Sequence, residues 1–196
     1  YGGSHLKGDR GQYPTHRLVV NLLGKIIDPN EHDIVLDMAM GSGGFLISTM
    51  RRVTQKIMAS NRPAHLKQSA VQQFYRRIFG IDKSPKLVKV ARTNMILASD
   101  GHSGLVKGDT LEPPARLPDA FLQKSGPGLP TVILTNPPFG ATAEHKITAE
   151  KDPQILEQFD VGKRWKRNDD GDLYPTDTLA ADGVPPEYLY VERSIK

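Results

Sequence analysis

The chain has 196 residues, of which 38% are hydrophobic, enough for one sizeable core with an appended segment. The absence of cysteine excludes disulfides and cysteine zinc sites and fits a reducing, cytoplasmic location, and no apolar run is long enough for a membrane span. A net charge of +4 mildly favours a polyanionic partner. Because the first residue is Tyr1 and not Met, we expect the chain to be cut from a longer protein.

Hydrophobic periodicity predicts helices and strands as far as residue 136. The first helix has Thr15 as its expected N-cap and an apolar face of Leu18, Val19, Leu22 and Leu23. A later helix is marked by Ser84 at its N-cap and Pro85 at its first position. The expected elements are, in chain order, a helix over 15–28, a strand over 33–40, helices over 45–60 and 64–77, a strand over 78–82, a helix over 85–100 and strands over 104–111 and 131–136.

This alternation predicts an α/β fold, with a parallel sheet and helices on both of its faces. Such sheets bind ligands beyond the carboxyl ends of their strands, and the unusual residues of this chain follow those ends. The periodicity is lost over 141–186, where we expect a polar loop. Residues 187–196 then look like the start of a further helix.

A glycine-rich segment, "DMAMGSGGFL", follows the first strand. Glycines let the backbone turn sharply and approach a ligand closely, and the following helix favours negative charge at its start. A phosphate or dinucleotide loop and a plain tight turn both remain open, because the third glycine of G-x-G-x-x-G is replaced by Leu46 and no P-loop lysine is present.

Acidic residues end the next two strands. Asp82 could accept hydrogen bonds from the two hydroxyls of a ribose, or could belong to the turn that caps the next helix. Asp109 could accept from the exocyclic amine of an adenine, or could be a turn residue after Gly108.

The fourth strand ends in "NPPF". The side-chain oxygen of Asn136 and the carbonyl of Pro137 can both accept from one planar NH2 group, and Phe139 offers a face on which a base can stack. Prolines fix the backbone and remove competing donors. Directly after "VILT", and together with the other strand ends, this pattern favours a functional site over a loop corner.

In this order, these four segments resemble the S-adenosylmethionine-dependent DNA methyltransferases that modify the exocyclic amine of adenine. "DMAMGSGGFL" with "NPPFG" resembles, more narrowly, the modification subunit of type I restriction–modification systems. The resemblance implies a Rossmann-like methyltransferase core over 1–140, truncated after the fourth strand, with 187–196 belonging to the same domain. It also implies DNA, a specificity subunit, an endonuclease subunit and a second modification subunit as partners.

The resemblance assigns roles to individual residues. The methionine end of the cofactor would lie against Thr15, Asp37, Ala39, Gly41 and Gly43. Asp82 would bind its ribose and Asp109 its adenine amine. Asn136 and the Pro137 carbonyl would grip the amine of an extruded adenine stacked on Phe139. This favours a more tetrahedral nitrogen that attacks the sulfonium methyl directly, without a covalent enzyme intermediate or a metal.

Some positions depart from the family pattern, and other functions stay open. His16, Met38 and Met40 stand where a proline, a proline and a cysteine are usual, so we expect altered packing around an intact loop. Alternatives are a methyltransferase that acts on protein glutamine or RNA, a non-catalytic cofactor-binding fragment, and a nicotinamide oxidoreductase, which the glycine spacing disfavours. We expect the 196 residues alone not to methylate DNA.

Weaker signals lie in the expected loop and among the histidines. "GKRWKRN" is either a DNA contact or a solvated run, and "NDDGDLY" reads as a turn because it lacks the closing glutamate of a calcium loop. The six histidines show no ligand spacing, so no metal is expected.

Overall fold

The computed structural model of the chain describes residues 15–98, 104–117, 129–139 and 145–195. The chain divides into two compact units. Of the described residues, 15–98, 104–110, 117 and 129–136 form what we call the sheet unit. Residues 111–116, 137–139 and 145–195 form the hairpin unit.

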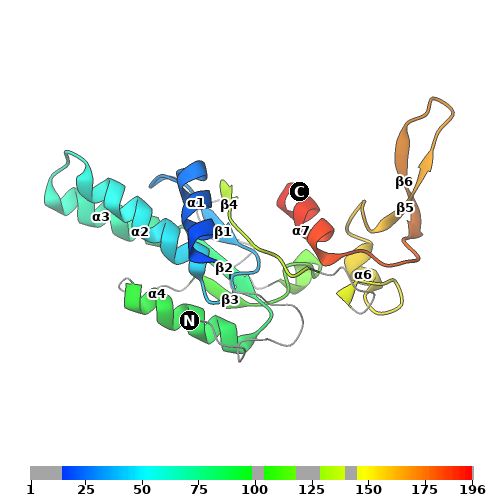
Figure 1. The fold of residues 1–196 in the computed structure, drawn as a ribbon, viewed down its shortest axis with the longest axis horizontal. Helices are drawn as coiled ribbons and strands as arrows, with labels where there is room; N and C mark the ends of the chain where they lie inside the picture. The colour runs from blue at the N-terminus through cyan, green and yellow to red at the C-terminus, as the bar shows by residue number, and fades with distance from the viewer. Residues whose placement is uncertain (1–14, 99–103, 118–128, 140–144, 196) are drawn as a thin grey trace. The chain divides into compact units, whose positions relative to one another are not determined.

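The sheet unit is built on four parallel strands in the spatial order β3–β2–β1–β4 (Figure 1). The strands are β1 (Val35–Asp37), β2 (Ile78–Asp82), β3 (Leu105–Lys107) and β4 (Val132–Ile133). The chain moves outward from β1 to β3 and then returns to the other side of β1. Strand order therefore reverses between β1 and β4, and a reversal of this kind leaves a crevice beyond the carboxyl ends of the two strands.

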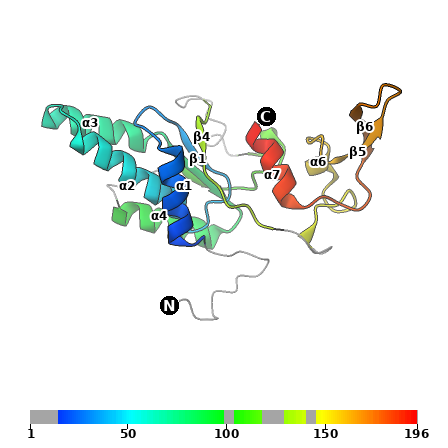
Figure 2. The same cartoon turned by 45° about the horizontal axis from the view of Figure 1, so that its top comes forward.

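Four helices accompany this sheet: α1 (Arg17–Ile27), α2 (Gly44–Ala59), α3 (Ala64–Tyr75) and α4 (Pro85–Ala98). Helix α2 packs on β1 and β2 and contacts each of the other three helices, with α3 alongside it (Figures 1 and 2). The buried side chains between helices and strands form one cluster that includes Val35, Leu46, Met50, Phe74, Ile78, Met95 and Leu105. The predicted parallel sheet with helices is confirmed.

Helix α1 differs from the prediction in its cap and in its buried face. Its N-cap is His16, not Thr15, and the His16 ring accepts from the Leu18 backbone N–H at 3.3 Å. Leu18 and Leu22 are 71% and 57% exposed, whereas Val20 and Gly24 are buried. Gly24 faces α2, where an added Cβ would lie 3.9 Å from the Ser48 hydroxyl oxygen. The predicted apolar face was therefore wrong for Leu18, Val19 and Leu22, which are exposed, whereas Leu23 is partly buried against the cluster of Val20, Phe45 and Leu134.

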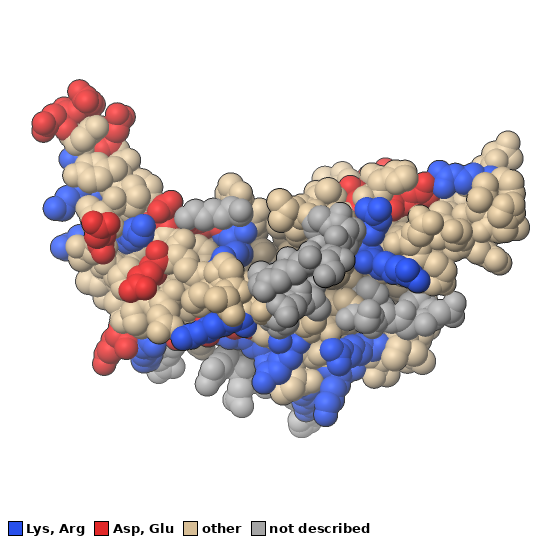
Figure 3. Space-filling model, turned by 180° about the vertical axis from the view of Figure 1, so that it is seen from behind, with Lys and Arg blue, Asp and Glu red and all other residues tan. Residues whose placement is uncertain are grey.

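The hairpin unit contains a structure that the sequence did not predict. Within the expected polar loop lie α6 (Pro153–Leu156) and an antiparallel pair, β5 (Lys163–Arg167) and β6 (Leu173–Leu179). Four of the five residues of β5 are basic, so the strand lacks the apolar alternation on which strand prediction depends. The turn between the strands was predicted: Asn168 N–H donates to the Asp172 carbonyl, and Gly171 takes a positive φ of 92°. Figure 3 shows acidic side chains at the tip of this hairpin and basic ones along it.

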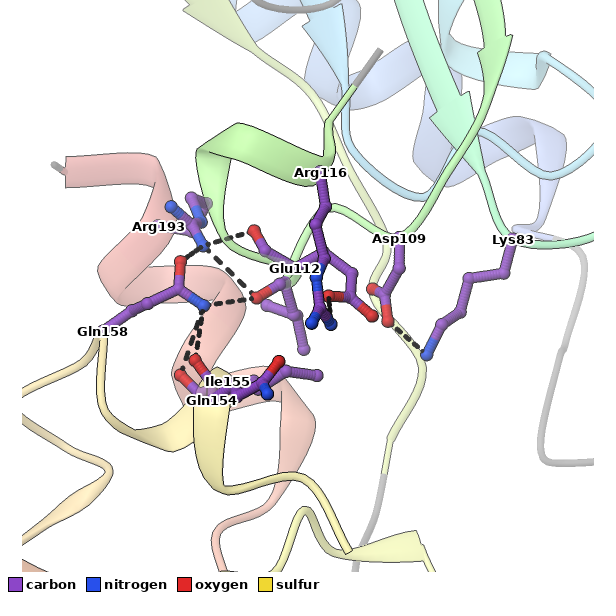
Figure 4. Close-up of polar contacts among 9 residues, drawn as sticks. Lys83, Asp109, Glu112, Arg116, Gln154, Ile155, Gln158 and Arg193 are labelled. Atoms are coloured by element: carbon purple, nitrogen blue, oxygen red, sulfur yellow. Dashed lines mark hydrogen bonds and ion pairs between the residues drawn. The ribbon is translucent and has the colours of Figure 1, made fainter.

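The hairpin unit also contains a short 3-10 helix, η2 (Pro114–Arg116), and the predicted C-terminal helix, α7 (Pro186–Ile195). Its Glu192 carboxylate accepts from the backbone N–H groups of Asp160 and Val161 at 2.7 and 2.9 Å. Arg193 donates to the Gln158 side chain at 2.7 Å (Figure 4) and lies over the Phe159 ring. Polar contacts thus join α7 to the segment before the hairpin. No helix among the described residues has the length and apolar character needed to cross a membrane.

Candidate cofactor and amine site

The glycine loop after β1 is held by β2. The backbone N–H of Met40 donates to the Ile81 carbonyl at 3.1 Å, and that of Gly41 donates to the Asp82 carboxylate at 2.9 Å. Gly41 and Gly43 have φ values of 53° and 84°, which side-chain-bearing residues rarely adopt. A Cβ added at Gly41 would meet no atom within 4 Å, so the loop presents open space at that position. The loop could therefore admit a ligand against its backbone.

Asp37 is the most deeply buried acidic group of the loop, with 1% of its surface exposed. Burial raises the pKa of its carboxyl from 3.8 to about 7. The Ala39 N–H and the Thr135 hydroxyl lower the pKa of Asp37, whereas the nearby charge of Asp82 raises it further. The Ala39 N–H donates to Asp37 at 3.1 Å. Asp37 is therefore poised between its neutral and ionised forms near neutral pH.

Asp82 belongs to the turn before α4, one of the two roles that the sequence allowed, and it also contacts the glycine loop. One carboxylate oxygen accepts from the Ser84 N–H at 2.8 Å, where Ser84 caps α4, and the other accepts from Gly41. Burial raises the pKa of Asp82 against these two hydrogen bonds, which lower it. A carboxylate oxygen can accept more than one hydrogen bond, so these contacts leave acceptor capacity for ribose hydroxyls.

Asp109 lies beyond the end of β3, paired with Lys83, which no sequence motif marks as a site residue. The Lys83 ammonium is 2.6 Å from the Asp109 carboxylate (Figure 4). The side chain of Asp109 is mostly buried, whereas that of Lys83 is exposed. Lys83 immediately follows Asp82, so the ends of β2 and β3 present both charges of this pair beside the predicted ribose-binding carboxylate.

Two further contacts around the loop were missed because their residues have no distinctive motif. The buried hydroxyl of Thr110 donates to the Met38 carbonyl at 2.6 Å, and the Asn94 side chain on α4 donates to the Ser42 carbonyl at 3.1 Å. Met38 and Met40 are themselves buried, and the Met40 sulfur lies against Gly80. The segments after β1, β2 and β3 are thus joined into one structure.

Asn136 follows β4, next to β1 in the sheet. The Leu134 N–H donates to the Leu36 carbonyl at 3.0 Å, which keeps this part of the chain along β1. The Asn136 amide nitrogen donates to the Thr15 hydroxyl at 3.0 Å. Pro137 and Phe139 belong to the hairpin unit, and Phe139 is 59% exposed. The sheet unit therefore brings together the expected residues Thr15, Asp37, Ala39, Gly41, Gly43, Asp82, Asp109 and Asn136 at the carboxyl ends of its strands.

No group of three or more histidine or acidic side chains in the described part of the chain could hold a metal ion. The arrangement instead offers acceptors of hydrogen bonds: carboxylates on the last residues of β1 and β2 and beyond β3, and an amide oxygen beyond β4. Such a set suits a ligand that carries hydroxyl and amine groups.

Comparison with known proteins shows the family of the chain. The sequence profile of the family described as "N-6 DNA Methylase" matches residues 3–168. The type II restriction enzyme and methyltransferase RM.BcgI of Heyndrickxia coagulans is 32% identical over 166 residues, which cover 83% of this chain and 24% of that protein. The type I restriction enzyme EcoKI methylase subunit of Escherichia coli K12 is 29% identical over 150 residues, which cover 72% and 26%. The chain spans about a quarter of the length of these relatives.

Solved structures show the same fold. A modification subunit of a putative type I restriction enzyme from Vibrio vulnificus has a TM-score of 0.56 and 26% identity over 78% of this chain and 27% of that one. The EcoKI M protein has a TM-score of 0.53 and 25% identity over 81% and 34%. The Rossmann-like fold of these methyltransferases and the resemblance to type I modification subunits are confirmed. The chain belongs to the N-6 DNA methylase family.

Proposed function

We propose that this chain is the catalytic part of a DNA methyltransferase that transfers a methyl group from S-adenosylmethionine to the N6 amine of a flipped adenine. The observation that carries the proposal is the reversal of strand order between β1 and β4. It brings the glycine loop after β1 and Asn136 after β4 to neighbouring strand ends. A methyl donor on the loop and an amine held by Asn136 would then meet in one crevice.

The residues of the sheet unit fit the cofactor. Open space at Gly41 and the free acceptor capacity of Asp82 suit a ribose with an adjoining chain, and Asp109 suits an adenine amine. When bound, the cofactor supplies a methyl group on a positively charged sulfur.

Asn136 would act on the amine. An aromatic amine is a weak nucleophile because its lone pair is delocalised into the ring. The Asn136 side-chain oxygen and the Pro137 carbonyl, both acceptors, would draw the two amine hydrogens and favour a tetrahedral nitrogen. Phe139, with its exposed ring, would stack on the extruded base and offset part of the cost of flipping it.

The partners follow from the same proposal. DNA is the substrate, and we place the protein in a restriction–modification system of the cytoplasm, with a specificity subunit, an endonuclease subunit and a second modification subunit. The name of RM.BcgI joins restriction and methyltransferase activities, so a fused arrangement is the alternative organisation. Basic β5 residues are candidates for phosphate contacts.

The test has two parts. Calorimetry of the 196-residue chain with S-adenosylmethionine measures cofactor binding, and tritium transfer from labelled cofactor to DNA, RNA and protein measures the acceptor. The transfer assay uses the protein together with the subunits that its activity requires, because we expect the 196 residues alone to bind cofactor without methylating DNA.

Asn136→Ala should lower the rate of methyl transfer to DNA by at least about a hundredfold, while the dissociation constant for the cofactor stays within about twofold of that of the unchanged protein. Asn61→Ala, at an exposed position beyond the end of α2, is the matched control and should behave as the unchanged protein. Normal methylation by Asn136→Ala would refute the proposal. Label appearing in RNA or protein in place of DNA would move the chain to the alternative substrates.

A further inference from the structure

Among the described residues, the Asn136 side chain forms its recorded hydrogen bond with Thr15, 121 residues earlier in the chain. The Asn136 amide nitrogen donates and the Thr15 hydroxyl oxygen accepts, at 3.0 Å. A hydroxyl can serve either end of an amide, but only this orientation leaves the amide oxygen free to accept from another group.

The Thr15 hydroxyl is available for this contact because of the way α1 begins. His16 is the N-cap, and its ring accepts from the Leu18 N–H, a task that would otherwise fall to a Thr or Ser hydroxyl. Thr15 stands one residue before the cap and outside the helix. His16, which stands where the family pattern has a proline, thus caps α1 and leaves the Thr15 hydroxyl available to contact Asn136.

Packing holds both partners in place. Val20 on α1, Phe45 on α2 and Leu134 before Asn136 form a separate buried cluster. It joins the first half of α1 to the end of β4, within six residues of Thr15 and two of Asn136. The Leu134 N–H is also bonded to β1. The Thr15–Asn136 contact therefore connects two segments that this buried cluster already holds beside each other.

We propose that Thr15 is a positioning residue that holds the Asn136 amide with its oxygen free for the target amine. The inference deepens the proposed function, on which it rests, and gives Thr15 a role distinct from contact with the cofactor. Without the hydroxyl, the amide would rotate freely, and its nitrogen could face the target amine, placing a donor against a donor. Losing one hydrogen bond of about 1 to 1.4 kcal/mol corresponds to a five- to tenfold lower rate of methyl transfer.

Two substitutions at Thr15 separate the hydroxyl from the shape of the side chain. Thr15→Val keeps the branched shape and removes the acceptor, whereas Thr15→Ser keeps the hydroxyl. Thr131→Val is the matched control, since the Thr131 hydroxyl bonds the Ile34 N–H and Asp33 at the opposite end of β4. It should lower stability and leave Asn136 unaffected.

The first readout needs no activity. In 15N-labelled protein, the side-chain NH2 signals of Asn136, assigned by their loss in Asn136→Ala, should shift and exchange faster with water in Thr15→Val. They should stay in place in Thr15→Ser and in Thr131→Val. Unchanged Asn136 signals in Thr15→Val would overturn the inference whatever the protein methylates.

The second readout is single-turnover methyl transfer by the complete protein at saturating cofactor. Thr15→Val should lower the rate about five- to tenfold with the cofactor dissociation constant within about twofold, and Thr15→Ser should restore the rate. A weakened cofactor affinity with an unchanged rate would assign Thr15 to the cofactor and refute the positioning role. If Asn136→Ala itself methylates normally, the proposed function fails, a result distinct from the failure of Thr15 alone.

Discussion

Replacing Asp37 by asparagine should stabilise the sheet unit at alkaline pH, although it removes a residue assigned to the cofactor site. Burial raises the pKa of Asp37 from 3.8 to about 7 in the folded protein. A raised folded pKa means that the fold binds the proton more tightly than the unfolded chain does. The resulting stability is fully present below about pH 3.8 and is lost as the pH rises through about 7.

The magnitude follows from the two pKa values. They differ by about 3, and each pH unit between them corresponds to about 1.4 kcal/mol, so ionised Asp37 lowers the free energy of unfolding by about 4 kcal/mol at pH 8. At pH 5 the free energy of unfolding is lowered by under about 2 kcal/mol, because most of the range between the two pKa values of Asp37 lies above that pH. Asparagine stays neutral, and its side-chain oxygen can still accept from the Ala39 N–H. The free energy of unfolding of Asp37→Asn, relative to that of the unchanged protein, should therefore be about 3 kcal/mol higher at pH 8 than at pH 5.

Urea unfolding at the two pH values, followed by the circular dichroism of the helices, measures this difference. The single tryptophan, Trp165, lies in the hairpin unit, so its fluorescence does not report on Asp37. The control is Asp28→Asn at the exposed C-cap of α1, where hydrogen bonds from Lys56 and Arg52 hold the pKa of Asp28 below its usual value. Its stabilising effect is lost only as the pH falls through that lowered pKa, so Asp28→Asn should destabilise equally at pH 5 and 8. An Asp37→Asn effect that is the same at both pH values would refute the reasoning.

Two further substitutions test the loop. Gly80→Ala would place a Cβ 2.6 Å from the Met40 sulfur and 2.8 Å from the buried Leu46 side chain, so the free energy of unfolding should fall by about 1–3 kcal/mol in urea titrations. Gly44→Ala, whose Cβ meets nothing within 4 Å, should leave stability unchanged or slightly higher, and equal behaviour of the two would contradict the packing argument. Asp82→Asn would turn an amide NH2 toward the N–H of Gly41 or Ser84. Affinity for S-adenosylmethionine, measured by calorimetry, should therefore fall by at least about tenfold, and an unchanged affinity would remove Asp82 from the cofactor site.

Local sequence signals identified the elements that depend on local physics. The strand over 78–82 was predicted at its observed bounds, and the helix after Ser84 begins at Pro85 as its cap requires. The turn at 168–172 was also predicted, because a glycine and an asparagine specify it within a few residues. The β5–β6 hairpin was missed because β5 has no alternation of apolar and polar residues. Its strands are defined by their pairing with each other, which no local pattern records.

The sequence by itself determined which polar groups end the strands: Asp37, Asp82, Asp109 and Asn136 are fixed by their positions after short apolar runs. The tertiary structure decided what those groups contact. Two of these contacts join residues that lie far apart in the chain: the ion pair of Lys83 with Asp109 and the hydrogen bond of Asn136 with Thr15. The raised pKa of Asp37 depends on burial, which only the folded protein provides. The buried face of α1 was decided in the same way, by the packing of Val20 against Phe45 and Leu134. Local patterns record what each segment prefers alone, whereas contacts between distant segments arise only when the sheet brings the strand ends together.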